Sequence, residues 1–145
     1  MKQISSRFSI AVHTMSMIAL KPSECTGDYI ARSVNSNPVI IRKIIAQLKK
    51  AGFIQVKAGV GGASLLKSAD EITLLDIYRA VEAADGGDLF KFHKSPAMDC
   101  SVGKHIEEVL HPEMVQAQLA LEQSLSSVSL AQIVTELEQR ALESS

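Results

Sequence analysis

Residues 37–66 read NPVIIRKIIAQLKKAGFIQVKAGVGGASLL, and this stretch decides the fold. Asn37 followed by Pro38 is a typical helix start, because the Asn side chain can cap the first turn and the proline ring suits the first helical position. Gly52 lies just beyond the end of this helix, where glycine is common. The short runs FIQVK and SLLK favour strands and flank the glycines of KAGVGGASL. The stretch therefore predicts a helix followed by a two-stranded hairpin with a glycine-rich tip.

The three glycines of the tip, Gly59, Gly61 and Gly62, allow two functional interpretations. A loop that cradles the phosphates of a nucleotide needs a helix directly after its last glycine, and here Gly62 leads into a strand. The loop also lacks the motifs G-x-G-x-x-G and GK[ST]. A hairpin tip that approaches the phosphates of a nucleic acid is favoured, with Lys57 beside it, and a purely structural hairpin is the alternative.

The helix that starts at Asn37 has two different faces at 100° per residue. Four residues form a narrow apolar stripe that we expect in the core: Ile41, Ile44, Ile45 and Leu48. The other face carries Arg42, Lys43, Lys49 and Lys50, with Val39 and Gln47 among them. A basic face opposite a core stripe is suited to binding a polyanion.

Two more helices are predicted upstream of residue 37. Apolar residues at helical spacing indicate an amphipathic helix from about Ser5 to Leu20, which Lys21-Pro22 ends. This stretch lacks the small-residue cleavage site of a signal peptide, and no run in the chain reaches the roughly 20 apolar residues of a membrane span. Thr26 caps a short second helix, GDYIARSV. Helix, turn, helix and hairpin follow in the order of a winged helix-turn-helix.

Charge is distributed unevenly along the 145 residues, although the net charge is only −1. Between residues 29 and 69 there is no Asp or Glu, and seven basic residues occur: Arg32, Arg42, Lys43, Lys49, Lys50, Lys57 and Lys67. After residue 105 acidic residues dominate. A basic face that is only solvated, with no binding function, is the alternative. The charge asymmetry favours a half that binds a polyanion and a second half of different function.

The second half is predicted to be helical. A capping box from Thr73 to Asp76 starts a helix within residues 71–84, and residues 85–101 read as a loop. A long helix then runs from Val102 to Leu125, interrupted or kinked at Pro112, and a capping box at Ser129 starts a last helix. We therefore expect a mainly α (α+β) protein with a DNA-binding domain at 1–84, a loop at 85–101 and a helical dimerisation region at 102–145.

Several motifs in this order resemble the Rrf2 family of bacterial transcription regulators, and the YwnA-like subgroup most. The similarity covers nearly the whole chain and includes NP-x-x-x-R, LKKAG and G-x-GG-x-x-L. It implies a homodimer formed by the helix near residues 102–125, and DNA contacts on the Asn37 helix and the wing. The implied DNA-binding residues are Asn37, Val39, Arg42, Lys43, Gln47, Lys50, Lys57, Gly59, Gly61 and Gly62.

Several members of this family hold an iron-sulfur cluster with three cysteines in the loop before the dimerisation helix. Here that loop, HKSPAMDCSVGKH, supplies Cys100 alone, so we expect no cluster. His93, Cys100, His105 and His111 lack the usual spacing of zinc ligands, and surface histidines are the favoured interpretation. No cofactor and no metal are predicted.

The two cysteines are too few for a disulfide scaffold, which favours a reducing, cytoplasmic setting. Cys100 lies near a helix start, where the helix dipole lowers the pKa of a thiol, so it is the candidate redox sensor. An inert loop cysteine is the alternative. Cys25 is the second candidate, although ordinary packing suits it better.

The function favoured by these observations is a sequence-specific, dimeric transcription repressor without enzymatic activity. No paired carboxylates, Ser/His/Asp set or nucleophile with a base stand out. The alternative is a winged-helix module whose basic face binds an acidic protein instead of double-stranded DNA.

Overall fold

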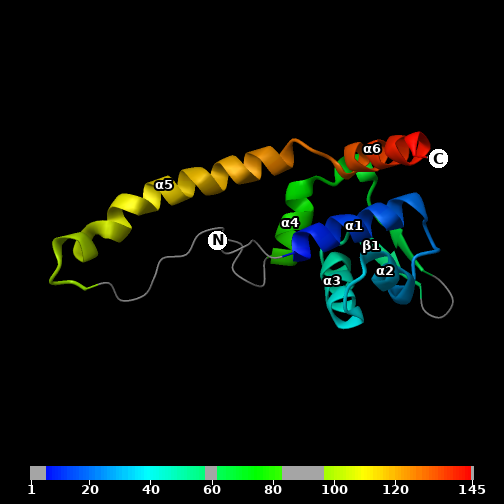
Figure 1. The fold of residues 1–145 in the computed structure, drawn as a ribbon, viewed down its shortest axis with the longest axis horizontal. Helices are drawn as coiled ribbons and strands as arrows, with labels where there is room; N and C mark the ends of the chain where they lie inside the picture. The colour runs from blue at the N-terminus through cyan, green and yellow to red at the C-terminus, as the bar shows by residue number, and fades with distance from the viewer. Residues whose placement is uncertain (1–5, 58–61, 83–96, 145) are drawn as a thin grey trace.

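The computed structural model describes residues 6–57, 62–82 and 97–144 (Figure 1). Its elements follow in the order α1 (Arg7–Leu20), α2 (Gly27–Val34), α3 (Pro38–Lys50), β1 (Ile54–Val56), β2 (Ala63–Leu65), η1 (Ala69–Glu71), α4 (Leu74–Glu82), α5 (Ser101–Ser126) and α6 (Leu130–Glu143). The fold is mainly helical with one small sheet, as the sequence predicts.

Local side-chain caps define the ends of the helix-turn-helix pair. Thr26 accepts a hydrogen bond from the N–H of Tyr29 at 3.2 Å, and Asn37 accepts one from the N–H of Val39 at 2.8 Å. Asn35 takes the left-handed conformation at the end of α2, which Asn tolerates better than most residues. Gly52 has φ +83° just after α3. Both predicted caps and the predicted glycine stop are confirmed.

The wing is an antiparallel hairpin in which Ile54 pairs with Leu65 and Val56 with Ala63. A third segment, which the sequence did not predict, pairs with it: Cys25 bridges to Ala63, and the N–H of Ser23 donates to the carbonyl of Ala63 at 3.0 Å. The base of the wing is therefore bound directly to the loop before α2.

One core joins the helices of the winged domain. Met15 and Ile18 of α1, Ile30 of α2, and Ile44 and Leu48 of α3 are buried. On α3 the predicted stripe is found, with Ile41, Ile44 and Leu48 buried and Ile45 half-buried. The outward face of α3 is thereby fixed by the core packing of its other face.

The last helix, α6, packs on α1 and η1, although the sequence grouped it with the dimerisation region. Leu130 is fully buried in the core of the winged domain, and its N–H donates to the carbonyl of Ile72 at 2.7 Å. The capping box at Ser129 is confirmed, with Gln132 as its partner. Helix α6 is thus part of the winged domain, which also contains α3.

In contrast, α5 extends away from the winged domain (Figure 1). It continues through Pro112 as one helix, so of the predicted interruption or kink the interruption is not found, and it has no buried residue. At its C-terminal end, Glu122 accepts from Arg79 of α4 at 3.0 Å. Within the described residues, no helix is both long and apolar enough to cross a membrane.

Candidate nucleic-acid interface

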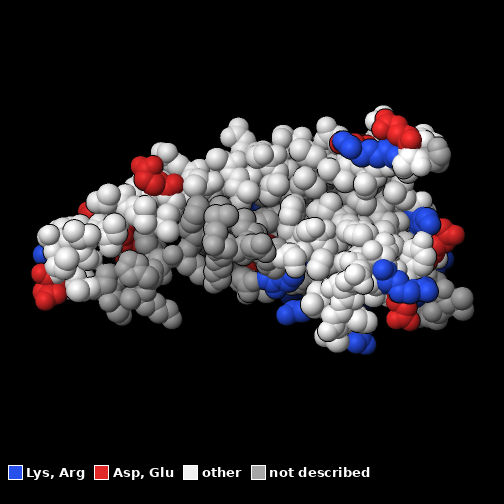
Figure 2. Space-filling view, in the orientation of Figure 1, with Lys and Arg blue, Asp and Glu red and all other residues white. Residues whose placement is uncertain are grey.

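The outward face of α3 is basic. Arg42, Lys43, Lys49 and Lys50 are exposed. Within the described ranges, no acidic side chain forms an ion pair with any of them. Figure 2 shows Lys and Arg side chains protruding at the lower edge of the winged domain, near α3, whereas acidic side chains mark the surface along α5. This uncompensated positive face attracts a polyanion.

Arg42 borders two shallow hollows on this surface. One is lined by Thr26, Gly27 and Asp28 at the start of α2 together with Pro38. The other lies between α3 and the wing and is lined also by Ile45, Ala46, Lys49 and Val56. From this position the guanidinium can approach either the start of α2 or the edge of the wing.

Two predicted contact residues of α3 are placed differently from the basic side chains. Asn37 is exposed, but its side-chain oxygen already accepts the N–H of Val39. Gln47 is half-buried, and its Oε1 is buried without a hydrogen-bond partner in the described part of the structure. Val39, in contrast, is 60% exposed in the first turn of the helix.

Lys57 and Gly62 are the predicted wing residues that the structure describes. Lys57 is exposed at the end of β1, whereas Gly59 and Gly61 lie outside the described residues. Gly62 is buried, and a Cβ there would come within 2.7 Å of the backbone nitrogen of Cys25. The lack of a side chain at Gly62 therefore allows close packing inside the protein, and its contact with a phosphate stays a prediction.

The two cysteines have opposite environments. Cys100 is exposed at the N-cap of α5, and the backbone N–H groups of Gly103 and Val102 lower the pKa of its thiol. Cys25 is buried behind the wing, and burial raises the pKa of its thiol. Only Cys100 combines access with stabilisation of the thiolate.

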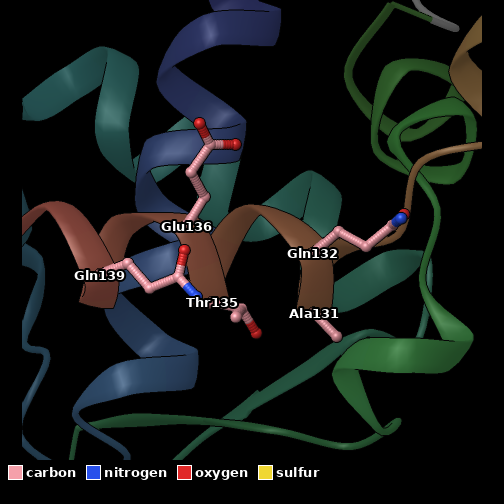
Figure 3. A pocket seen from close by; sticks show the side chains of 5 residues that line it. All are labelled: Ala131, Gln132, Thr135, Glu136 and Gln139. Atoms are coloured by element: carbon pink, nitrogen blue, oxygen red, sulfur yellow. The ribbon is translucent and has the colours of Figure 1, made fainter.

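A further hollow lies on α6 and is lined by Ala131, Gln132, Thr135, Glu136 and Gln139. Figure 3 shows that these side chains all come from one helix and point in different directions. Since their polar groups do not converge on one point, this hollow is not a candidate site.

A family model described as "Rrf2: Iron-dependent Transcriptional regulator" matches residues 4–136. The chain belongs to the Rrf2 family. Rrf2 proteins are transcriptional regulators and not enzymes, and they bind DNA. This chain is therefore a DNA-binding transcriptional regulator of the Rrf2 family with a winged helix-turn-helix fold.

Individual relatives agree with this assignment. The chain is 40% identical over 134 residues to the Bacillus subtilis (strain 168) protein "Putative HTH-type transcriptional regulator YwnA", covering 92% of this chain and 98% of that protein. It is 39% identical to a crystallised "putative DNA binding protein" with a TM-score of 0.72, over 88% and 98% of the two chains. T. potens IscR, at 23% identity and a TM-score of 0.66 over 96% and 90% of the chains, shares the fold.

The residues of this Rrf2 protein do not fit the iron-sulfur cluster known in the family. The chain has two cysteines in total. Cys25 is buried at the base of the wing and Cys100 lies at the start of α5, so they belong to different parts of the fold. Within the described residues, no three His, Cys, Asp or Glu side chains are grouped to hold a metal ion; His93 lies outside that range.

Proposed function

We propose that this Rrf2 protein is a sequence-specific transcription repressor that binds its operator as a homodimer in the cytoplasm. In this proposal α3 enters the major groove and the wing lies over the adjacent backbone. The observation that carries it is the outward face of α3, with four exposed basic residues that form no ion pair with any acidic residue in the described part of the chain.

A second copy of the chain is the partner we propose for α5. Val102, Ile106 and Val109 recur at helical spacing and Leu110 lies beside them. Val102 is 65% and Val109 68% exposed, although both are aliphatic. A long helix with an unburied aliphatic stripe is stabilised when the same stripe of another copy covers it.

Duplex binding at graded salt concentrations tests the proposed function. If a dimer neutralises six to eight phosphates, log K should fall with log salt at a slope of roughly −5 to −7. The double variant Arg42→Glu and Lys50→Glu should abolish binding and leave the dimer intact in sedimentation.

The matched control is the double variant Lys104→Glu with Arg140→Glu. It changes the net charge by the same amount as the α3 double variant, but on α5 and α6. This control should bind DNA almost as the unaltered protein does. Retained binding by the α3 double variant would exclude this face as the DNA-binding surface. If duplex DNA is not bound and an acidic protein is, the chain is the alternative winged-helix module.

We also propose that a thiol regulates DNA binding. The exposed Cys100 thiolate would attack a peroxide oxygen, giving a sulfenic acid and releasing hydroxide. Its helix, α5, is linked to the winged domain through Arg79 and Glu122. A change at Cys100 can therefore alter how two winged domains are held at half-sites about 34 Å apart.

The variant Cys100→Ser should keep its DNA affinity. In the unaltered protein, peroxide, hypochlorite or a quinone should weaken DNA binding, and in this variant they should not. Anisotropy measured with one duplex before and after each oxidant gives the readout. Cys25→Ser is the matched control and should respond as the unaltered protein does. An oxidant response that survives in Cys100→Ser would remove Cys100 as the sensor.

A further inference from the structure

The exposed residues of α3 belong to only two chemical classes. Four are basic, Arg42, Lys43, Lys49 and Lys50, and the others are apolar: Pro38, Val39, Ile40 and Ala46. This helix exposes no carboxylate, hydroxyl or amide. Its one amide, on Gln47, is half-buried with its oxygen turned into the protein.

Each base has a preferred side-chain partner in the major groove. Arg or Lys bonds to the O6 and N7 atoms of guanine, an amide bonds to adenine, a carboxylate accepts from cytosine, and an apolar side chain contacts the C5-methyl group of thymine. The exposed face of α3 therefore has partners for guanine and thymine, and none for adenine or cytosine. Asn37, just before the helix, uses its amide oxygen in the cap.

Two of the four apolar residues lie within the basic face. At 100° per residue, Val39 and Ala46 differ by only about 20° around α3, and Arg42 and Lys43 lie on either side of them. The first turn of a recognition helix is the part that contacts base edges. Val39 is in that turn, and the Asn37 cap holds its N–H at 2.8 Å.

We infer that α3 recognises thymine through its methyl group, with Val39 as the specificity-determining contact and Arg42 on a neighbouring guanine or phosphate. Val39 has a stiff, branched side chain, so little side-chain entropy is lost when a methyl group packs against it. Ala46 continues the same line about 10.5 Å along the helix, close to the length of three base-pair steps. This inference rests on the proposed function.

The test starts from a duplex site selected from random sequence by the unaltered protein. Each thymine in turn is replaced by deoxyuridine, which removes the methyl group and keeps the base pair. At one thymine or more per half-site, the affinity should fall about four-fold, the effect expected for one buried methyl group.

The same replacements are measured with Val39→Ala and Val39→Thr. Val39→Ala should bind the thymine and deoxyuridine duplexes equally at that position, and Val39→Thr, which keeps one methyl group, should lose less. Because Val39 is 60% exposed, the thermal midpoints of both variants should match that of the unaltered protein.

Two negative results have different meanings. If the protein binds its selected site but no deoxyuridine replacement changes the affinity, or Val39→Ala keeps the full effect at every position, the thymine inference is wrong and the proposed function stands. If no duplex is bound at any salt concentration, the proposed function fails and the inference fails with it.

Discussion

Gly62 has a structural requirement that its position in a glycine-rich loop conceals. A Cβ there would come within 2.7 Å of the nitrogen and 2.9 Å of the carbonyl carbon of Cys25, both backbone atoms that the wing pairing holds in place. We expect Gly62→Ala to lower the free energy of unfolding by about 1–3 kcal/mol, the usual cost of overpacking. Urea unfolding measures this.

Gly27 is the matched control for this substitution. It is the first residue of α2, and a Cβ there would meet nothing within 4 Å. Gly27→Ala should change the unfolding free energy by less than about 0.5 kcal/mol. Equal stabilities of the two alanine variants would contradict the packing account of Gly62.

The thiols of Cys100 and Cys25 should differ strongly in reactivity. The nearby backbone N–H groups of Gly103 and Val102 lower the pKa of the Cys100 thiol, so its thiolate forms at lower pH than that of an ordinary cysteine. Burial raises the pKa of Cys25 and also denies access to it. Iodoacetamide labelling of the native protein between about pH 6 and 9, read by peptide mass spectrometry, should modify Cys100 first throughout.

Cys25 should become reactive only after unfolding in urea. Faster labelling of Cys25 than of Cys100 in the native protein, or a labelling midpoint for Cys100 above that of a short cysteine peptide, would contradict this assignment.

Asn37 is both the N-cap of helix α3 and a predicted DNA contact. Its Oδ1 accepts the N–H of Val39, so Asn37→Ala should cost about 1 kcal/mol of stability through fraying of α3. Asn37→Ser keeps a capping oxygen and should retain the stability. The serine lacks the amide N–H groups, however, so its DNA affinity should fall.

Thermal unfolding and duplex binding of both variants separate these two roles. If Asn37→Ser keeps both the stability and the affinity, Asn37 is a cap only and is removed from the DNA-binding set.

Helix ends were predictable from sequence because caps depend on residues only two or three positions apart. Thr26, Asn37 and Ser129 are found as the sequence predicts. The pairing of Cys25 with Ala63 was not predictable, because it joins residues 38 positions apart and leaves no periodic pattern. For the same reason the internal role of Gly62 was missed.

The basic face of α3 was predictable for a different reason. Once the apolar stripe is assigned to the core, helix geometry fixes what faces outward. The partner of an amphipathic helix is not fixed in this way. The capping box at Ser129 predicted where α6 begins, but only the structure places Leu130 in the core of the winged domain.

For the whole molecule, the proposed dimer links the aliphatic stripe of α5 to DNA binding by α3. Two protomers double the number of phosphates that are neutralised, and operator affinity depends on both half-sites. Because Val109 is 68% exposed in the single chain, Val109→Glu should leave the fold intact and prevent the second copy from packing.

Sedimentation equilibrium should therefore give a particle of 15.7 kDa for Val109→Glu and one of twice that mass for the unaltered protein. Val115→Glu is the matched control, because Val115 lies about 120° around α5 from Val109, outside the stripe. It should remain a dimer.

Because a monomer engages only half of the basic surface, the salt slope of DNA binding by Val109→Glu should fall to roughly −3, and its operator affinity should fall with it. A dimeric Val109→Glu protein would exclude the stripe as the interface, and a monomer with unaltered slope and affinity would show that DNA binding does not require the dimer.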